Sequence, residues 1–239
     1  MPTPPFPPPK PVANIWRPEL TRLPRLNRAR LLFRASARLL ARILIRLLTR
    51  ATILGLDHFP SHGPAVIVVN HLGDADTAFL LGFLPFLPEA LGKVELYEFP
   101  ILGRLMDWYG IIWLHRGRPD RRALGCAMDV LAEGRFIVIA PEGRYSLVRG
   151  LEEGSPGAAY LALKAKAPVV PIALTGTENT SVYGDLRRLK RPKITLTVGQ
   201  PFHLLNEGAE VQDNLQSGTR KIMESLAQLL PIEYRGFYK

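Results

Sequence analysis

The sequence predicts an α/β fold with a mostly parallel central sheet and helices on both of its faces. Short apolar segments of strand length alternate along the chain with longer segments of helical periodicity, an order typical of parallel sheets. With 239 residues the chain is long enough for one sizeable α/β core. A strongly basic segment precedes that body. We therefore expect one folded domain with a distinct N-terminal attachment.

The expected strands are apolar runs bounded by turn residues, and helices are expected between and after them. The strands cover residues 65–69, 93–97, 111–114, 135–140, 168–174 and 193–198. The helices cover residues 76–84, 100–109, 119–133, 156–166 and 208–230. Sites in such folds gather at the carboxyl ends of the strands. Polar residues that directly follow a strand are therefore the first candidates for function.

The excess positive charge is confined to the first 50 residues. They hold one lysine and ten arginines against a single acid, a net charge of +10, so residues 51–239 are neutral overall. A neutral body argues against a nucleic-acid-binding domain, which needs a basic face. Residues 1–25 are rich in proline and show no apolar run, so we expect no signal peptide there.

Residues 26–52 are expected to form one basic amphipathic helix. Most of its leucines and isoleucines fall on the arc opposite a set of arginines that recur at every fourth position. These arginines are Arg30, Arg34, Arg38, Arg42, Arg46 and Arg50. No uncharged run approaches the ~20 residues needed to span a bilayer. We expect the helix to lie on an anionic membrane surface, with arginines meeting lipid phosphates. The alternative is a helix docked on its own domain with a solvated arginine face.

A histidine and an aspartate follow the first expected strand at a spacing that suits proton transfer. Asn70-His71 comes directly after residues 65–69, and Asp76 follows His71 by five residues. A carboxylate on one ring nitrogen fixes the tautomer and leaves the other nitrogen free to take a proton. No serine or cysteine stands nearby as a nucleophile, so the substrate would supply the hydroxyl. The alternative is a satisfied polar pair, the commoner meaning of this spacing.

Two later strands also end in polar residues. One ends at Arg116, and the next is followed by Glu142-Gly143-Arg144. In order, and together with Asn70-His71 to Asp76 and the Val-Pro strand at 168–174, these pieces resemble the glycerolipid acyltransferase family typified by lysophosphatidic acid acyltransferase. The resemblance covers about residues 51–205, and the ordered set is far more specific than any single motif.

The chain departs from the family pattern at three places. His115 precedes Arg116, where the family usually has an aspartate. Arg144 and Tyr145 stand where the family has threonine and arginine. Residues 155–158 align with a segment that often carries a lysine, and this chain has none there.

The resemblance implies an O-acyltransferase domain over residues 53–239. His71 would remove the proton of the acceptor hydroxyl while Asp76 orients the imidazole. The implied substrate-binding residues are Asn70, Arg116, Glu142, Gly143 and Arg144. Arg116 and Arg144 would bind the acceptor phosphate, because guanidinium pairs with phosphate at two points. The alternative for Arg144 is an ordinary surface arginine.

The resemblance also implies the substrates. The donor would be an acyl thioester on coenzyme A or acyl carrier protein, and the acceptor a lysophospholipid, foremost 1-acylglycerol 3-phosphate. We expect no cofactor, no metal site and no nucleic-acid partner, and a peripheral location on the cytoplasmic face of an anionic membrane. The alternatives are an acyltransferase for a different polar lipid, or a non-catalytic peripheral membrane protein on the same fold.

Three further features have ordinary structural interpretations. Cys126 lies in an expected helix and is interpreted as a core residue. The apolar stretch 79–87 is expected to pack in the core, with an acyl channel as the alternative. Asn179-Thr180-Ser181 matches a glycosylation sequon and is expected to be a polar loop.

Overall fold

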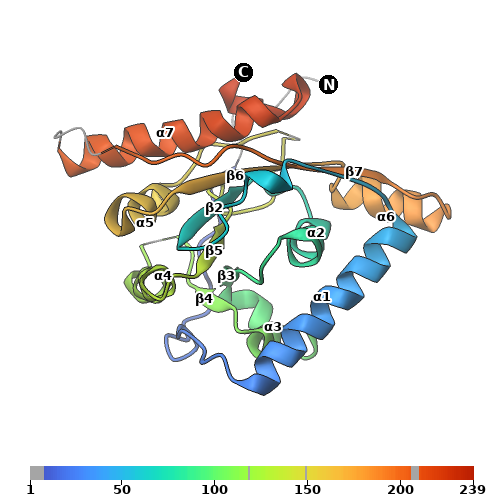
Figure 1. The fold of residues 1–239 in the computed structure, drawn as a ribbon, viewed down its shortest axis with the longest axis horizontal. Helices are drawn as coiled ribbons and strands as arrows, with labels where there is room; N and C mark the ends of the chain where they lie inside the picture. The colour runs from blue at the N-terminus through green and yellow to red at the C-terminus, as the bar shows by residue number, and fades with distance from the viewer. Residues whose placement is uncertain (1–7, 118, 149, 206–209) are drawn as a thin grey trace.

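A seven-stranded sheet forms the centre of the computed structural model, which describes residues 8–117, 119–148, 150–205 and 210–239 (Figure 1). The strand order within this part of the chain is β1-β7-β6-β2-β5-β3-β4. All neighbouring strands are parallel except β6 and β7, so the expected mostly parallel sheet is confirmed. The strands are β1 Arg50–Leu54, β2 Ala65–Val69, β3 Glu89–Lys93, β4 Ile112–Leu114, β5 Phe136–Ile139, β6 Val169–Thr175 and β7 Lys193–Val198.

Helices cover both faces of the sheet, also as expected (Figure 1). The α-helices are α1 Arg28–Leu48, α2 Ala75–Phe83, α3 Leu102–Tyr109, α4 Arg121–Ala132, α5 Gly157–Ala165, α6 Asn179–Arg187 and α7 Val211–Leu229. The 3-10 helices are η1 Leu56–His58, η2 Val94–Glu98, η3 Ile232–Tyr234 and η4 Gly236–Tyr238. Helices α4, α5 and α7 pack on one face, and α1, α2 and α6 pack on the other.

Strand β2 lies at the centre of the sheet and is buried along its whole length. Val66 and Val68 point into the core under α4, α5 and α7, whereas Ile67 and Val69 point into the core under α2. Burial on both faces explains why this strand is a continuous apolar run in the sequence. The stretch 79–87 also contributes buried residues to the core, as expected, and Cys126 packs half-buried against the other side.

Three expected elements are wrong. The strand expected at 93–97 is the 3-10 helix η2, and the true strand β3 lies just before it, where the buried Glu89 hid it from a hydropathy pattern. The helix expected to reach residue 52 ends at Leu48, because residues 50–54 pair with β7 as a strand. The loop expected at Asn179 is the first turn of α6.

Helix α1 presents its apolar side chains outward and several arginines inward, the reverse of the alternative in which the helix docks with a solvated arginine face. Arg34 is buried, and the guanidinium groups of Arg38 and Arg42 donate to the carbonyls of Leu84 and Gly82 at the end of α2. Eight large apolar side chains of α1 are 44–69% exposed: Leu31, Leu32, Leu39, Leu40, Ile43, Leu44, Leu47 and Leu48. The predicted amphipathicity is present, and the expected membrane contact stays a prediction. The inward contacts of Arg34, Arg38 and Arg42 were not expected from the sequence.

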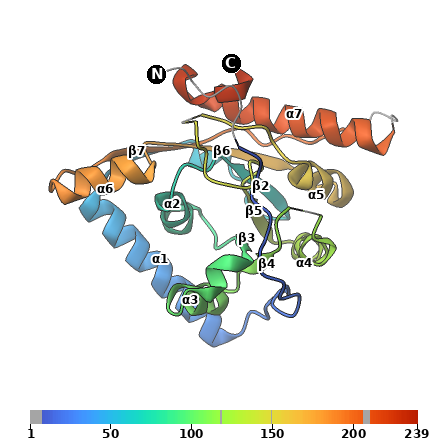
Figure 2. The same ribbon diagram turned by 180° about the vertical axis from the view of Figure 1, so that it is seen from behind.

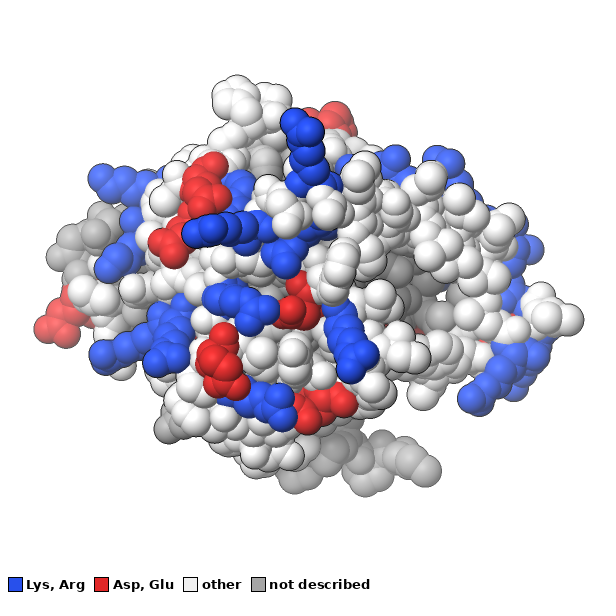
Figure 3. Space-filling view, turned by 90° about the horizontal axis from the view of Figure 1, so that it is seen from below, with Lys and Arg blue, Asp and Glu red and all other residues white. Residues whose placement is uncertain are grey.

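The underside of the molecule, along which α1 runs, carries a broad uncoloured area with basic side chains at its outer edge (Figure 3). Helix α3 adds the exposed Leu105 and Trp108 beside Phe33 of α1, whose ring lies 5.9 Å from that of Trp108. We call the outward leucines and isoleucine of α1 together with Leu105 and Trp108 the apolar face. Within the described residues, no helix has both the length and the hydropathy needed to cross a membrane.

The segment before α1, residues 8–21, forms a strap along the carboxyl ends of β4 and β5 (Figure 2). The amide of Ala13 donates to the carbonyl of Arg116 at 2.9 Å, and the carbonyl of Pro9 accepts from Arg144 at 3.2 Å. We call this segment the N-terminal strap. The expected proline-rich segment 1–25 falls partly on residues 1–7, and the expected helix 208–230 partly on residues 208–209; both parts lie outside the described residues.

Candidate active site

His71 and Asp76 form a hydrogen-bonded pair directly after the central strand β2. The His71 Nδ1 lies 2.8 Å from Asp76 Oδ2, and because a carboxylate only accepts, Nδ1 carries the proton. The Nε2 atom has no hydrogen-bond partner among the described residues, and the side chain is 26% exposed. The imidazole is therefore held as the tautomer whose accessible nitrogen takes a proton.

Asp76 holds more than the histidine. The same Oδ2 atom accepts the amide N–H groups of Leu72 at 2.7 Å and Gly73 at 3.0 Å. The turn between β2 and α2 is thus wrapped around one buried carboxylate oxygen. These two amides are occupied, so stabilisation of an oxyanion at this site is left to other donors.

Glu142 joins the turn after β2 to the loop after β5. Its Oε1 accepts the amide of His71 at 3.0 Å, and its Oε2 accepts the amide of Glu152 at 2.8 Å. The side chain is fully buried. Burial raises the pKa of Glu142 to about 7, although the two amide hydrogen bonds act in the opposite direction. Glu142 therefore fixes the backbone that carries His71, and its charge is costly at this depth.

Asn70 and Gly143 also serve the backbone of the site. Both polar groups of the Asn70 side chain bond to Leu174 of β6, at 2.8 Å through Nδ2 and 2.7 Å through Oδ1. The Asn70 side chain thus ties the end of β2 to β6, and its expected contact with substrate stays a prediction. Gly143 has φ +71°, a left-handed conformation that lets the chain turn sharply after β5.

Arg116 lies at the end of β4, apart from the His71–Asp76 pair. Three strand spacings separate β4 from β2, about 14 Å at the usual spacing. Its Nη2 lies 3.5 Å from Glu95 Oε1, the outer limit of a hydrogen bond. The Arg116 Nε and Glu95 Oε2 atoms are buried without a partner among the described residues. This loose pair leaves Arg116 with donors for an anionic ligand.

Arg144 is neither a surface arginine nor a free cation. Its Nε donates to Glu152 at 2.7 Å and its Nη1 to the carbonyl of Pro9, and the side chain is 8% exposed. The alternative of an ordinary surface arginine is wrong, and the charge of Arg144 is matched by a buried carboxylate. That Arg144 binds the acceptor stays a prediction. Arg144 instead ties the loop after β5 to the N-terminal strap.

Tyr145 occupies the place next to His71. The two ring centroids lie 4.3 Å apart in an edge-to-face arrangement. The Tyr145 hydroxyl donates to Asp74 at 2.6 Å, and the Tyr183 hydroxyl donates to the other oxygen of the same carboxylate at 2.9 Å. Burial alone would raise the pKa of Asp74, but hydrogen bonds from the two tyrosines and Asn179 hold it below the ordinary value. Both tyrosine protons are thus committed to Asp74.

A second histidine and aspartate, His115 and Asp120, have the same spacing, but here both ring nitrogens of the histidine are hydrogen-bonded. The His115 Nδ1 lies 3.0 Å from Asp120 Oδ2, as in the first pair. Its Nε2, however, accepts the amide N–H of Arg17 from the N-terminal strap at 3.0 Å, and the side chain is buried. Asp120 also caps the start of α4. This is the satisfied polar pair that the spacing alone would predict, and it anchors the strap.

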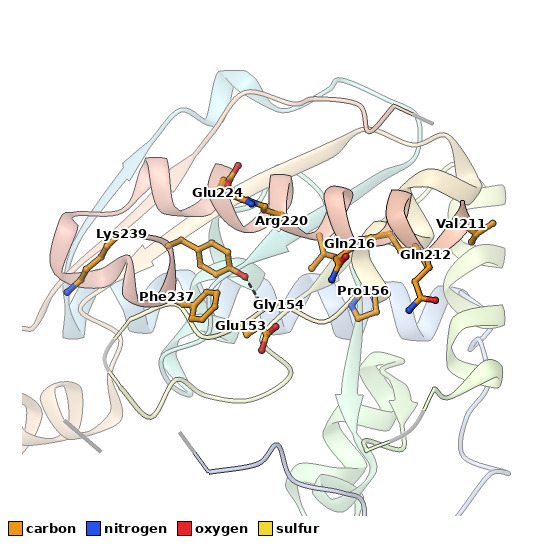
Figure 4. A pocket seen from close by; sticks show the side chains of 13 residues that line it. Glu153, Gly154, Pro156, Val211, Gln212, Gln216, Arg220, Glu224, Phe237 and Lys239 are labelled. Atoms are coloured by element: carbon orange, nitrogen blue, oxygen red, sulfur yellow. Dashed lines mark hydrogen bonds and ion pairs between the residues drawn. The ribbon is translucent and has the colours of Figure 1, made fainter. Parts of the chain in front are cut away.

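An open cleft of about 990 Å³ lies between α7, the loop at 153–156 and the C-terminal residues (Figure 4). The Tyr238 hydroxyl accepts the amide of Gly154 across it at 3.2 Å. None of the residues that we expected in the site lines this cleft. The described residues also contain no group of three or more His, Cys, Asp or Glu side chains that could hold a metal ion.

The structure thus brings together His71, Asp76, Glu142 and Gly143. Arg116 lies apart from them, at the end of the edge strand β4, where the N-terminal strap contacts its carbonyl. Three residues near the site were not expected from the sequence: Asp74, Tyr183 and Lys10. Asp74 lies between His71 and Asp76 in the sequence, and its polar side chain was the one local feature that could have marked it as part of the site. Lys10 and Tyr183 come from distant segments and gave none.

Comparison with known proteins identifies a family. The model of the family described as "Acyltransferase" matches residues 50–175. The chain is 30% identical over 181 residues to the chloroplastic 1-acyl-sn-glycerol-3-phosphate acyltransferase LPAT1 of Arabidopsis thaliana, covering 74% of this chain and 49% of that protein. It is 29% identical over 191 residues to the 1-acyl-sn-glycerol-3-phosphate acyltransferase of Pseudomonas aeruginosa, covering 78% of this chain and 72% of that protein.

The chain spans about half the length of LPAT1 and of further plant and algal relatives. Among solved structures, the fold is similar to that of the 1-acyl-sn-glycerophosphate (LPA) acyltransferase PlsC from Thermotoga maritima. That likeness has a TM-score of 0.61 at 19% sequence identity and covers 84% of this chain and 81% of that one. Two chains this different in sequence share the same α/β architecture.

Proposed function

This chain belongs to the acyltransferase family, and from that premise we propose that it transfers an acyl group from a thioester to the free hydroxyl of a lysoglycerolipid. The observation that carries the proposal is the His71 imidazole at the end of β2. Its Nδ1 is bonded to Asp76, and its Nε2 has no partner within the described chain. Such a base, with no side-chain nucleophile bonded to it, needs a hydroxyl from the substrate.

The proposed chemistry is direct acyl transfer. His71 Nε2 takes the proton of the acceptor hydroxyl as its oxygen attacks the thioester carbonyl, and Asp76 stabilises the resulting imidazolium. The tetrahedral intermediate collapses as the carbon–sulfur bond breaks. The leaving thiolate then receives the proton from His71. The products are the acylated lipid and the free thiol, and the enzyme is regenerated.

The proposed acceptor is 1-acylglycerol 3-phosphate, which becomes phosphatidic acid. The relatives described above are named for that acceptor, which supports the assignment. Arg116 is the proposed phosphate ligand, because it has unused donors in a partly buried setting. Asn70, Glu142, Gly143 and Arg144 are proposed to hold the site in shape rather than to touch the acceptor.

A different polar lipid is the second candidate acceptor. The observation that favours it is the loop after β5, where Tyr145 stands next to His71 and Arg144 is neutralised by Glu152. The Tyr145 hydroxyl donates to Asp74 and the charge of Arg144 is matched by Glu152, so neither side chain offers a phosphate an uncompensated positive charge. A hydroxyl-bearing head group needs no such charge. The proposed donor is an acyl thioester of coenzyme A or of acyl carrier protein, with no cofactor or metal ion.

We also propose that the protein lies peripherally on an anionic membrane at its cytoplasmic face. The apolar face supports this location, since apolar side chains of such number are rarely left in water on one helix. Exposed arginines at both ends of α1, such as Arg28 and Arg46, would meet lipid phosphates. The single cysteine is compatible with a reducing compartment.

Thioester consumption tests the proposal. Purified protein is mixed with labelled acyl-CoA and, in separate reactions, 1-acylglycerol 3-phosphate, other lysophospholipids and monoacylglycerol, and the lipid products are analysed. We expect thiol release and a diacyl product with the phosphate-bearing acceptor, and neither with the His71→Ala variant. Product formation only with another acceptor would select the second candidate. No release with any acceptor or either donor would favour a non-catalytic membrane protein.

A further inference from the structure

The N-terminal strap carries a lysine to the edge of the site. The Lys10 Nζ atom donates one hydrogen bond, to the carbonyl of Glu153 at 2.7 Å. Its other two N–H groups have no partner among the described residues. The neighbouring Pro9 carbonyl accepts from Arg144, so the strap is fixed on both sides of this point. The ammonium group therefore stands at a defined place with two donors to spare.

Lys10 stands close to the residues that support the catalytic histidine. Burial lowers the pKa of Lys10, and the negative charges of Glu152 and Glu142 oppose that shift. Glu142 is the residue whose carboxylate accepts the His71 amide. Lys10 thus lies on the same edge of the sheet as His71. Within the described part of the chain its direct partner is a neutral carbonyl, so no ion pair there neutralises its positive charge.

The other polar side chains around His71 are engaged with carboxylates. Arg144 is paired with Glu152, and the Tyr145 and Tyr183 hydroxyls both donate to Asp74. A phosphate monoester, which only accepts hydrogen bonds at neutral pH, would find a carboxylate and no free donor at the Asp74 side. Arg144 keeps unused N–H groups, but its charge is matched at 2.7 Å by Glu152. Lys10 forms no ion pair within the described residues, and Arg116 has only the loose pair with Glu95 at 3.5 Å.

Lys10 and Arg116 are also linked through the strap. The Ala13 amide donates to the Arg116 carbonyl, and Ala13 lies three residues after Lys10. Three residues of chain span at most about 11 Å. Lys10 and the backbone of Arg116 are therefore attached to nearby points of the strap, and both residues carry long cationic side chains.

We propose that Lys10 binds the phosphate group of the acceptor lipid, together with Arg116, and that the N-terminal strap is a wall of the acceptor site. The inference rests on the proposed acyl transfer and adds a residue to it. It also explains how a chain without a lysine at residues 155–158 and without an arginine at residue 145 holds a phosphate. The missing cation comes from a segment far away in the sequence.

The test compares Lys10→Gln, Lys10→Arg and the control Lys164→Gln. The control makes the same charge change on an exposed residue near the end of α5, at the opposite edge of the sheet. For Lys10→Gln we expect a roughly tenfold rise in KM for 1-acylglycerol 3-phosphate with kcat nearly unchanged. The KM values for monoacylglycerol and for acyl-CoA should stay at the wild-type level. Lys10→Arg should restore most of the loss, and Lys164→Gln should behave like the wild type.

A binding measurement separates this inference from the proposed reaction. Calorimetry with sn-glycerol 3-phosphate, a soluble analogue of the acceptor head group, should show weaker binding for Lys10→Gln and unchanged binding for Lys164→Gln, whether or not the protein turns over a thioester. The inference is overturned if head-group binding is unaffected by Lys10→Gln. It is also overturned if the kinetic loss falls on kcat, on acyl-CoA, or equally on the acceptor without phosphate.

Discussion

Arg34 of α1 and Glu89 of β3 form a two-point ion pair in the interior, with oxygen–nitrogen distances of 2.7 and 2.6 Å and both side chains 1% exposed. Arg135 donates to the same carboxylate at 2.7 Å. A helix with outward leucines is thus held to the sheet by buried charges. Two arginines on one carboxylate satisfy both of its oxygens, as a buried ion requires.

Removing one partner of this pair should unfold the protein more easily. Arg34→Ala leaves Glu89 short of a partner in the interior, so we expect a loss of about 3–5 kcal/mol in the free energy of unfolding. Urea denaturation measures it. Arg46→Ala, an exposed arginine on the same helix, should change stability by less than about 0.5 kcal/mol. Equal effects of the two substitutions would show that α1 is not held by Arg34.

His71→Ala should abolish acyl transfer with little change in thermal stability, since the ring is partly exposed and packs mainly on Tyr145. Asp76→Asn should lower turnover by a factor on the order of 10³–10⁴, because an amide does not hold the required tautomer. It should also destabilise the protein, by about 1–3 kcal/mol, because Asp76 accepts two backbone amides as well. Steady-state rates and unfolding curves are compared. Near wild-type turnover of His71→Ala would refute the base assignment.

The apolar face should control binding to lipid vesicles. The double variant Leu39→Gln, Ile43→Gln places two amides in the middle of this face, so we expect weaker flotation with neutral and anionic vesicles alike. Leu189→Gln changes an even more exposed leucine after α6 and serves as the control. Arg28→Gln with Arg46→Gln should reduce binding only to anionic vesicles, and added salt should mimic it. Unchanged flotation of the leucine variant would rule out this face.

Substitution of Arg116 and of Arg144 should affect kcat/KM for the two acceptors differently. Arg116→Ala should lower kcat/KM for the phosphate-bearing acceptor by roughly tenfold to a hundredfold, the worth of a charge-assisted bond, and leave monoacylglycerol unaffected. Arg144→Ala leaves Glu152 unpaired, so the loop loosens and both acceptors should suffer equally. Measuring both variants with both acceptors checks this. A loss for Arg144→Ala confined to the phosphate-bearing acceptor would return that arginine to the phosphate site.

Glu142 should make stability depend on pH in the acid range. Burial raises its pKa from 4.5 to about 7, so between these values the folded chain binds more protons than the unfolded chain. The contribution of this group to stability therefore falls as pH rises from 4.5 to 7. Glu142→Gln does not titrate. The stability of the wild type relative to Glu142→Gln should decrease across that range in urea denaturation, and a constant difference would contradict the raised pKa.

The sequence predicted the elements whose burial leaves a hydrophobic signature. Strands β2, β5 and β6 are apolar runs between turn residues, and each lies where it was expected to within about two residues. Strand β3 was misplaced because its first residue is a carboxylate, and burial of Glu89 depends on arginines that lie 55 and 46 residues away. Strand β1 was hidden because the arginine repeat continues past the end of α1 into Arg50.

The site was predictable where its parts are local and unpredictable where they are not. The His71–Asp76 pair lies within one turn, so spacing alone indicated it. The roles of Asn70 and Arg144 depend on Leu174 and Glu152, and nothing in the spacing names those partners. The vacancy at His71 Nε2 and the occupied Nε2 of His115 differ only because the N-terminal strap covers one of them.

The two sides of helix α1 serve different purposes: one attaches the helix to the domain, and the other is available to a lipid surface. Its inward arginines determine how firmly the helix is attached to the domain, and its outward leucines contribute less to folding than core residues do, because each stays 44–69% exposed in the folded chain. Substitutions among the most exposed of them, such as Leu32 and Leu47, therefore cost less folding stability than substitutions in the core. The residence time of the protein on a lipid surface is then tunable over a wide range, in evolution or by engineering, without a compensating change in the core.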